Sequence, residues 1–441
     1  MMNIICNSKF KIKDIFKSYW DSFLECFPNL NIRDIVHYEV QKIILCKSFK
    51  LGYSLYECPN CNNTIFVPHT CKSRFCSSCG VSYIKNRVIN SKHKILKCNH
   101  RHIVFTIPES LRNLFLENRS LLNLLFDSVN ETFTWMFNPS SYKNKQNKKH
   151  YTKRSKKIYR TNKDSCLVPG FICVLHTYGR DLKWNPHIHV LASEGALTNS
   201  SFKFKKISHF NYESLRKTFQ KILLDKLYNH FGRSFYNTKC ALYASHNNGF
   251  YVYAHPKQFK KLESGISYVL RYAGKPAMAE SRITNIDYDN NTISYWYDDH
   301  KTKQRIFVTE HVFEFIAKLI RHIPDKNFKM IRYYGLYAAK NHKYQNYYDK
   351  MYKVEYIKQL SISNNWRSNL ISSFQYDPLL CKCGHIMKIY ATYIPINIKE
   401  GEWYEIKYGK EKQKIYYNWE QRFGYDPEND RRRNQVCYSI L

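Results

Sequence analysis

The sequence lacks any apolar run long enough to cross a membrane, and it is poor in acidic residues. No stretch approaches the roughly 18–20 consecutive apolar residues that a spanning helix needs. The first residues, MMNIICNSKFKIKD, contain no signal-peptide core, so we expect a cytoplasmic protein. Only 35 Asp and Glu stand against 70 Lys and Arg, which leaves a formal net charge of +35. This imbalance predicts a polyanionic partner, with nucleic acid as the first candidate.

The chain nevertheless has enough apolar residues to fold. Of its 441 residues, 44% are hydrophobic and 16% aromatic, and this apolar content is ample for packed cores. The length suggests two or three domains. A disordered chain is excluded. Helical periodicity predicts a helical pair at 11–27 and 31–47, a long helix at 111–137, and later helices at 211–231, 257–273 and 309–322. Alternation predicts a strand pair at 241–253 and short strands over 283–308.

Fifteen cysteines in a reducing compartment indicate zinc ligands or buried thiols rather than disulfides. Cys58-Pro-Asn-Cys61 and Cys76-Ser-Ser-Cys79-Gly form two C-x-x-C pairs about fifteen residues apart, each with a turn-forming residue inside or just behind it. The pattern predicts one tetrahedral zinc site made by these four cysteines. The alternative is free core thiols.

Other residues around these pairs are not part of the predicted zinc site. Cys71 and His69 are left over by the four-cysteine assignment. Basic side chains nearby suit phosphate contacts, although such a run is often only a solvated face. These side chains are Lys72, Arg74, Lys85 and Arg87.

A histidine-rich segment at 171–197 reads as two strands joined by a turn at 179–186. Side chains alternate along a strand, so His187 and His189 leave the same face about 6–7 Å apart. His176 can lie on the neighbouring strand, about 5 Å away. The three imidazoles are therefore predicted to converge on one divalent cation. Because the chain has 18 histidines, and a second His-x-His occurs at 100–102, satisfied or surface histidines are the alternative.

Several segments together resemble a known family. The stretch HTYGRDLKWNPHIHVL resembles the HUH endonucleases, and most closely their rolling-circle insertion-sequence transposases, the two-tyrosine members of IS ninety-one type with an N-terminal zinc-binding domain. Further matching pieces are CKSRFCSSCG, HIVFTIP, SYVLRY followed by AESRI, and IRYYGLYA, in that order over nearly the whole chain. The resemblance implies cleavage of single-stranded DNA by tyrosine with a divalent cation, Mg²⁺ or Mn²⁺.

The nucleophiles implied by the resemblance are Tyr268 and Tyr272. Four residues apart on a helix, they share one face and can reach one cleft. Among 37 tyrosines the same spacing recurs elsewhere, so spacing alone would favour packing or stacking aromatics. Arg271 and Lys275 are expected to contact phosphate or to favour the phenolate.

The resemblance also bears on single residues near the ends of the pattern. Relatives resemble this chain at Cys71, which either ligates a second ion with an upstream residue such as His37 or caps the fold. His102, on the strand that resembles the first strand of the HUH fold, is expected near the metal. Cys381-Lys-Cys383-Gly-His385 stands where relatives tend to carry C-x-x-C-G, and the missing residue argues against a metal there.

The expected fold is α+β in three parts. Residues 1–98 form a helical and zinc-ribbon-like DNA-binding module that binds Zn²⁺, and residues 99–283 form the HUH catalytic domain, an antiparallel sheet flanked by helices. Residues 284–441 form a basic, tyrosine-rich region of hairpins and helices, where aromatics suit unpaired bases or plain packing. Residues 139–165 carry eleven Lys, Arg and His residues and one acid, which predicts a basic DNA-binding loop, with a solubilising insertion as the alternative. Its proposed contacts are Lys148, Lys149, Lys153, Arg154, Lys156 and Lys157.

The expected activity is cutting and rejoining of DNA strands through a 5′-phosphotyrosine. The covalent bond keeps the energy of the phosphodiester, so no nucleotide cofactor is needed, and no G-x-x-x-x-G-K-[ST] motif occurs. A plasmid relaxase or replication initiator with the same chemistry is one alternative. A non-catalytic zinc-finger DNA-binding protein, or a regulator built on an inactive transposase, is another.

Overall fold

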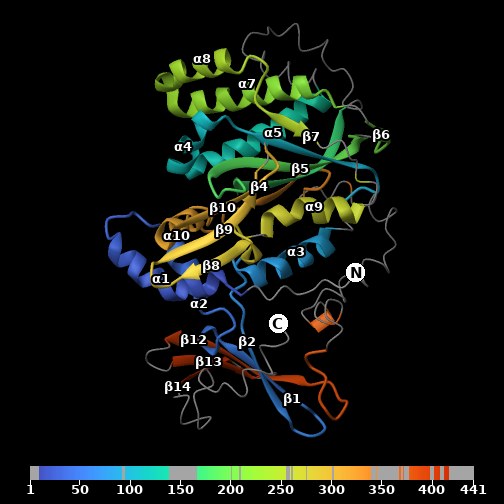
Figure 1. Cartoon of the computed structure of the whole chain (residues 1–441). Coiled ribbons are helices and arrows are strands. Elements are labelled where there is room, and N and C mark those ends of the chain that lie inside the picture. Colours follow the sequence, from blue (N-terminus) through green and yellow to red (C-terminus); the bar gives the residue numbers. More distant parts are fainter. Residues whose placement is uncertain are drawn as a thin grey trace.

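The fold is α+β, as the sequence predicts, with helices packed on antiparallel sheets (Figure 1). The computed structural model describes residues 9–91, 95–138, 166–199, 201–207, 210–254, 259, 262–274, 276–299, 302–338, 344, 367–368, 371, 377–397, 402–407 and 412–416. Three sheets are found within these residues. In the same residues, no helix is both long and apolar enough to span a membrane.

A central sheet in the order β11-β4-β5-β3-β7 carries the histidine segment, and β6 adds to β5. Its strands are β3 (His100–Thr106), β4 (Leu167–Tyr178), β5 (Trp184–Thr198), β6 (Phe204–Lys206), β7 (Val252–Ala254) and β11 (Ile331–Gly335). The β4–β5 pair is longer than the predicted hairpin. Because helices cover both faces of the sheet, most residues of both strands are buried instead of alternating.

One face of the central sheet packs against α4 (Glu109–Glu117), α5 (Leu122–Phe137) and α7 (Tyr212–Phe231), and α8 (Tyr236–Ser245) packs on α7. Short 3-10 turns lie at Arg119–Leu121 and Gly232–Phe235. Phe105 from the sheet meets Phe133 and Phe219 from the helices in the largest hydrophobic core. The opposite face is covered by α9 (Leu262–Gly274), whose Ile266 and Val269 pack with Val174 of β4.

Two local predictions on the first face are wrong. The predicted helix 111–137 is interrupted, because the side-chain oxygen of Asn118 accepts a hydrogen bond from the Ser120 N–H and starts a separate turn. Of the predicted strand pair 241–253, residues 241–245 are instead the end of α8. Gly249, at φ +85°, follows that helix in a turn, and only residues 252–254 form a strand.

The N-terminal helices share a core with a second sheet. These elements are α1 (Ile12–Cys26), α2 (Asp34–Ile44), α3 (Ser77–Ser91), β8 (Ile283–Asp287), β9 (Thr292–Asp298), β10 (Arg305–His311) and α10 (Val312–Ile320), with a 3-10 turn at Glu280–Arg282. Phe23 of α1 packs edge-on against Phe313 of α10, and Tyr295 of β9 contacts Phe315. The N-terminal module is therefore continuous with chain from beyond residue 283.

A third sheet joins the two ends of the described chain in the order β14-β13-β12-β1-β2. It contains β1 (Tyr53–Glu57), β2 (Thr64–Pro68), β12 (Lys388–Asn397), β13 (Glu402–Lys407) and β14 (Lys412–Tyr416), and a 3-10 turn at Phe49–Leu51 precedes β1. The Tyr53 ring stacks on Tyr393 with centroids 4.6 Å apart. Since β12 pairs with β1 and β11 with β4, the sheets do not follow the expected division at residues 98 and 283.

A single carboxylate connects the N-terminal helices to the segment after α9. Oε1 of Glu280 accepts from the Ile12 backbone N–H at the start of α1 (3.0 Å) and from the Ser77 hydroxyl at the start of α3 (2.7 Å). A negative charge is favourable at helix N-termini, where backbone N–H groups have no partner within the helix. Glu280 lies within the AESRI segment, which therefore has a structural role.

Removing this carboxylate should destabilise the junction. We expect Glu280→Ala to lower the free energy of unfolding by about 1–3 kcal/mol, as for hydrogen bonds to a charged group. Asp21→Ala, at an exposed position in the interior of α1, is the control and should stay within about 0.5 kcal/mol of the parent. Urea unfolding measures both, and equal effects would contradict the role of Glu280.

Candidate active site and metal centres

The β4–β5 register brings the three predicted histidines together. His176 is directly opposite His187, and His189 follows two residues later on the same face. His176 Nδ1 lies 3.1 Å from His187 Nε2, and the three residues offer nitrogens that all lie within 4.8 Å of one another. Metal–nitrogen bonds of about 2.0–2.1 Å place neighbouring nitrogens about 3 Å apart, so this donor set fits one cation.

The surroundings keep these imidazoles in the state that metal ligands need. Burial lowers the pKa of His187 to about 4, and it lowers the pKa of His189 well below the usual value, so both are neutral at pH 7. The His187 Nδ1–H donates to the Asn185 carbonyl at 2.6 Å. This hydrogen bond leaves the lone pair of Nε2 directed toward the cluster.

His102 adds a neighbour from the adjacent strand. Its Nε2 lies 2.8 Å from Nδ1 of His189, and the two rings stack with centroids 5.1 Å apart. This contact engages Nδ1 of His189, so His102 fixes the orientation of the His189 ring. By contrast, His100 is a core residue that bonds to the Cys98 carbonyl and the Tyr337 hydroxyl.

Helix α9 places Tyr268 over the same face. Its ring makes a T-shaped contact with that of His102, with centroids 5.1 Å apart. His102 therefore lies between Tyr268 and His189 and contacts both. The guanidinium of Arg271 lies 5.2 Å from the centre of the Tyr268 ring and is exposed. Tyr272 belongs to α9, but its side chain, like all of Lys275, lies outside the described residues.

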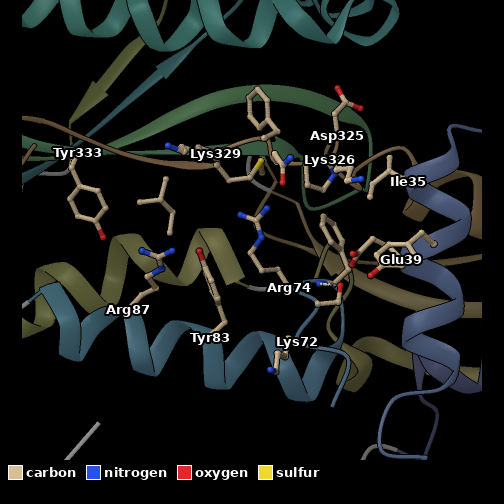
Figure 2. A pocket seen from close by; sticks show the side chains of 18 residues that line it. Ile35, Glu39, Lys72, Arg74, Tyr83, Arg87, Asp325, Lys326, Lys329 and Tyr333 are labelled. Atoms are coloured by element: carbon tan, nitrogen blue, oxygen red, sulfur yellow. Dashed lines mark hydrogen bonds between the residues drawn. The ribbon is translucent and has the colours of Figure 1, made fainter. Parts of the chain in front are cut away.

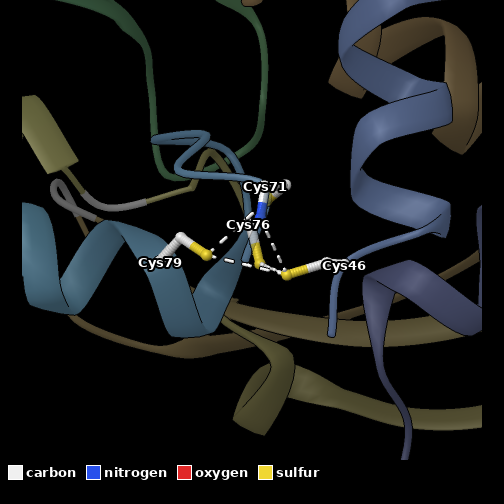
Figure 3. A group of neighbouring side chains, drawn as sticks. All are labelled: Cys46, Cys71, Cys76 and Cys79. Carbon is white, nitrogen blue, oxygen red and sulfur yellow. Dashed lines mark hydrogen bonds between the residues drawn. The ribbon is translucent and has the colours of Figure 1, made fainter. Parts of the chain in front are cut away.

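A first group of four thiols lies where α2, the segment before α3, and α3 meet (Figure 3). Its members are Cys46, Cys71, Cys76 and Cys79, all buried. The Sγ atom of Cys79 lies 3.6 Å from the Sγ atoms of Cys46 and of Cys71, and Cys76 Sγ lies 3.8 Å from Cys46 Sγ. A tetrahedron with Zn–S bonds of about 2.3 Å has edges of about 3.8 Å, so the thiols fit one zinc ion.

A second group of four thiols lies where the chain leaves β1 and where it approaches β12, two neighbouring strands of the third sheet. Cys58 Sγ lies 3.4 Å from Cys383 Sγ, and Cys61 Sγ lies 3.5 Å from Cys381 Sγ. Cys58 and Cys381 are buried, whereas Cys61 and Cys383 are exposed. The backbone hydrogen bond from His385 is the main cause that lowers the pKa of Cys383 to about 5, which favours the thiolate that binds metal.

The structure corrects the predicted zinc ligand set. Each C-x-x-C pair belongs to a different group, so Cys58 and Cys61 do not share an ion with Cys76 and Cys79. Cys71 has Cys46 as its upstream neighbour in place of His37, which packs against Trp20. His69 bonds to Ser54 and belongs to neither group.

Two features of the sequence conceal the true pairing. Cys46 is isolated in a helical stretch, and only the unpaired Cys71 signals that one more thiol is needed. Cys381 and Cys383 are separated by one residue instead of two. Gly384, at φ +83°, closes a tight turn in which the Cys381 N–H bonds to the His385 carbonyl, and this turn brings both thiols to one side.

The predicted DNA contacts are only partly described. Arg74 and Arg87 flank the ring of Tyr83 on and beside α3, with guanidinium-to-centroid distances of 5.7 and 5.3 Å. Lys72 is exposed, and the side chain of Lys85 is outside the described residues. The whole basic loop 139–165, with Lys148, Lys149, Lys153, Arg154, Lys156 and Lys157, also lies outside them and stays a prediction.

Comparisons with known proteins match both the region of the first thiol group and the region of the three histidines. Residues 15–107 match a family model described as "Transposase zinc-binding domain", and residues 170–345 match one described as "Putative transposase". The transposase for insertion sequence element IS801 from Pseudomonas savastanoi pv. phaseolicola is 28% identical over 75% of this chain and 77% of its own length. The putative transposase y4qJ from Sinorhizobium fredii (strain NBRC 101917 / NGR234) is 23% identical over 74% and 79%. No solved structure gives a significant match.

The two thiol groups predict separable zinc ions. We expect two zinc ions per chain, one lost in Cys46→Ser and the other in Cys383→Ser, because each substitution removes one of four ligands. Inductively coupled plasma mass spectrometry of the purified variants measures the content. Cys240→Ser, at an exposed cysteine outside both groups, should keep both ions. Loss of both ions in either single variant would contradict two independent sites.

Proposed function

Because the chain belongs to the insertion-sequence transposases with an N-terminal zinc-binding domain, we propose that it cuts and rejoins single-stranded DNA at a mobile-element end by rolling-circle transposition. The observation that carries the proposal is the histidine cluster, with His189 buried, beneath a helix that presents Tyr268. Plain zinc-finger binding would need no such cluster. A relaxase or replication initiator would share this site, and the comparisons favour the transposase.

The proposed reaction exchanges one phosphate ester for another. His176, His187 and His189 would hold a divalent cation, which when bound polarises the scissile phosphate. The Tyr268 hydroxyl loses its proton to solvent, and its oxygen attacks phosphorus in line. The bond from phosphorus to the 3′-oxygen breaks, and that oxygen takes up a proton. The products are a 5′-phosphotyrosine and a free 3′-hydroxyl, so a later 3′-hydroxyl can reverse the exchange on another strand.

Tyr272 is proposed as the second nucleophile, four residues further along α9. Residues at this spacing share a helix face, so both phenols can serve one phosphate site in turn. One tyrosine holds the first 5′ end while the other attacks the next junction. Arg271, exposed beside Tyr268, is suited to contact the phosphate that approaches this face.

The donor set bears on the choice of cation. Mg²⁺ prefers oxygen ligands and gives up its water reluctantly, whereas imidazole suits borderline transition ions. Three histidine donors therefore favour Mn²⁺ over Mg²⁺ at this site, although both are compatible with the chemistry.

Removing a histidine should separate cleavage from binding. We expect His187→Ala and His189→Ala to abolish cleavage of a labelled single-stranded oligonucleotide with Mn²⁺ or Mg²⁺, while its affinity stays nearly unchanged, because binding is mostly a phosphate term spread over many cations. His102→Ala should slow cleavage by about 10–100-fold, since it orients a ligand. His230→Ala, exposed on α7, is the control. Cleavage that survives in His187→Ala or His189→Ala would refute the site.

The two tyrosines can be distinguished by covalent adducts. We expect Tyr268→Phe with Tyr272→Phe to form no protein–DNA adduct on a denaturing gel, because no phenol oxygen remains to attack. At least one single variant should form the adduct yet fail to complete transfer in cells. Tyr236→Phe on α8 removes an exposed phenol elsewhere and should behave as the parent. Adducts in the double variant would place the nucleophile at another tyrosine.

A further inference from the structure

A basic cleft lies between the N-terminal helices and the segment that leads into β11 (Figure 2). It encloses about 710 Å³, within the roughly 300–1,000 Å³ of ligand-binding clefts. One wall comes from α2, α3 and the residues just before α3, and the other from residues 324–333. It is distinct from the histidine cluster, since none of its lining residues is one of the three histidines.

The charges of this cleft are unbalanced. Five cationic side chains line it: Lys72, Arg74, Arg87, Lys326 and Lys329. Within the described part of the chain, none of the five has a carboxylate at ion-pair distance. The two acids of the lining are already engaged, Glu39 with Lys42 at 3.2 Å and Asp325 with Arg33. The cleft is therefore suited to bind an anionic ligand, whose negative charge would balance these cations.

Aromatic rings lie between these cations. Tyr83, on α3, has the guanidinium of Arg74 on one side and that of Arg87 on the other. Tyr333 faces them from β11, where its hydroxyl lies 3.0 Å from Ser91 Oγ, and Tyr38 of α2, also in the lining, is 60% exposed. Figure 2 shows Tyr83, Arg87 and Tyr333 directed into one space. Rings interleaved with cations are typical of sites that stack bases and hold phosphates.

The cleft borders the central sheet at β11. Tyr333 and Ile331 of β11 belong to the same core as Ile172 and Val174 of β4, and His176 follows these two at the same strand parity. Helix α3, which carries Tyr83 and Arg87, packs along α9, which carries Tyr268 (Figure 1). The cleft and the proposed nucleophile Tyr268 therefore lie on neighbouring packed helices.

We propose that this cleft binds an unpaired segment of the DNA strand that flanks the scissile phosphate, with Tyr83 stacking on a base and Arg74 and Arg87 contacting phosphates. The proposal rests on the proposed function, because it takes the substrate to be a single DNA strand. Duplex DNA fits the cleft poorly, since its bases are stacked on one another and present no free face to a tyrosine. Burial lowers the pKa of Arg74, and a phosphate beside it would offset that loss of solvation.

Binding of fluorescent oligonucleotides tests the cleft directly. The full chain carrying Tyr83→Ala or Arg87→Gln is compared with Tyr236→Ala and Arg233→Gln, exposed positions on and beside α8, far from α3 (Figure 1). We expect Tyr83→Ala to weaken binding of an unpaired oligonucleotide at least about fivefold, as for the loss of one stacked base. Arg87→Gln should reduce the slope of log affinity against log salt by about 0.7. Both control variants should bind as the parent does.

The outcomes separate this proposal from the proposed function. Unchanged affinity and salt slope in Tyr83→Ala and Arg87→Gln would overturn the cleft as a DNA site, whatever the cleavage assay shows. If Tyr83→Ala weakened binding of blunt duplex DNA, or of heparin as a polyanion without bases, as much as binding of unpaired DNA, the cleft proposal would also be overturned. Stacking on unpaired bases would then not be involved. Weakened binding of unpaired DNA that accompanies failed adduct formation in the parent chain would keep the cleft and reject the chemistry.

Discussion

The register of the β4–β5 ladder is the constraint on which the proposed active site depends. His176 and His187 are opposite partners, and strand alternation places His189 beside them, so one alignment of two strands fixes the cluster. A slip by one residue would turn all of these side chains into the opposite core, where Phe105 and Phe133 pack. Helices on both faces make such a slip costly, because it would expose apolar residues and bury imidazoles without partners.

The thiol group formed by Cys46, Cys71, Cys76 and Cys79 is connected through α3 to α9, the helix that carries Tyr268. Cys76 and Cys79 lie just before and within the first turn of α3, so four-thiol coordination would fix where that helix begins. Helix α3 then packs along α9, and Glu280 holds the starts of α1 and α3 from the segment after α9. Zinc binding in the N-terminal module and the position of Tyr268 are therefore linked through packed helices, although neither thiol group shares a residue with the histidine cluster.

The sequence predicted contacts within one motif much better than contacts between distant segments. The histidine pair, the C-x-x-C pairs and the main helices are local patterns, and the α+β class follows from them. The pairing of Cys46 with Cys71, and of Cys58 with Cys383, depends on how sheets join residues far apart in the chain. Periodicity carries no information on such pairings. The helix at 236–245 was misread for a similar reason, because Asn247-Asn248-Gly249 ends a helix as readily as it turns a hairpin.

The basic cleft could not have been found from composition alone. Lys72, Arg74 and Arg87 were visible as a cationic run, but nothing in the sequence placed Lys326, Lys329 and Tyr333 opposite them. The net positive charge of the chain predicts a polyanionic partner. The fold determines at which place on the molecule cations face one another without carboxylates to neutralise them.

The pairing of Cys58 with Cys383 also has a consequence for how the chain is made. These residues are 325 positions apart, so at a synthesis rate of about 5–20 residues per second β1 waits roughly 16–65 s for its neighbour β12 to leave the ribosome. During that interval the edge of β1 that β12 later covers has unpaired backbone groups, which are a template for association with other chains. The short, two-stranded β1–β2 hairpin is marginal by itself. Any chain interrupted before β12 keeps this edge open, so completion of translation is coupled to closure of the third sheet.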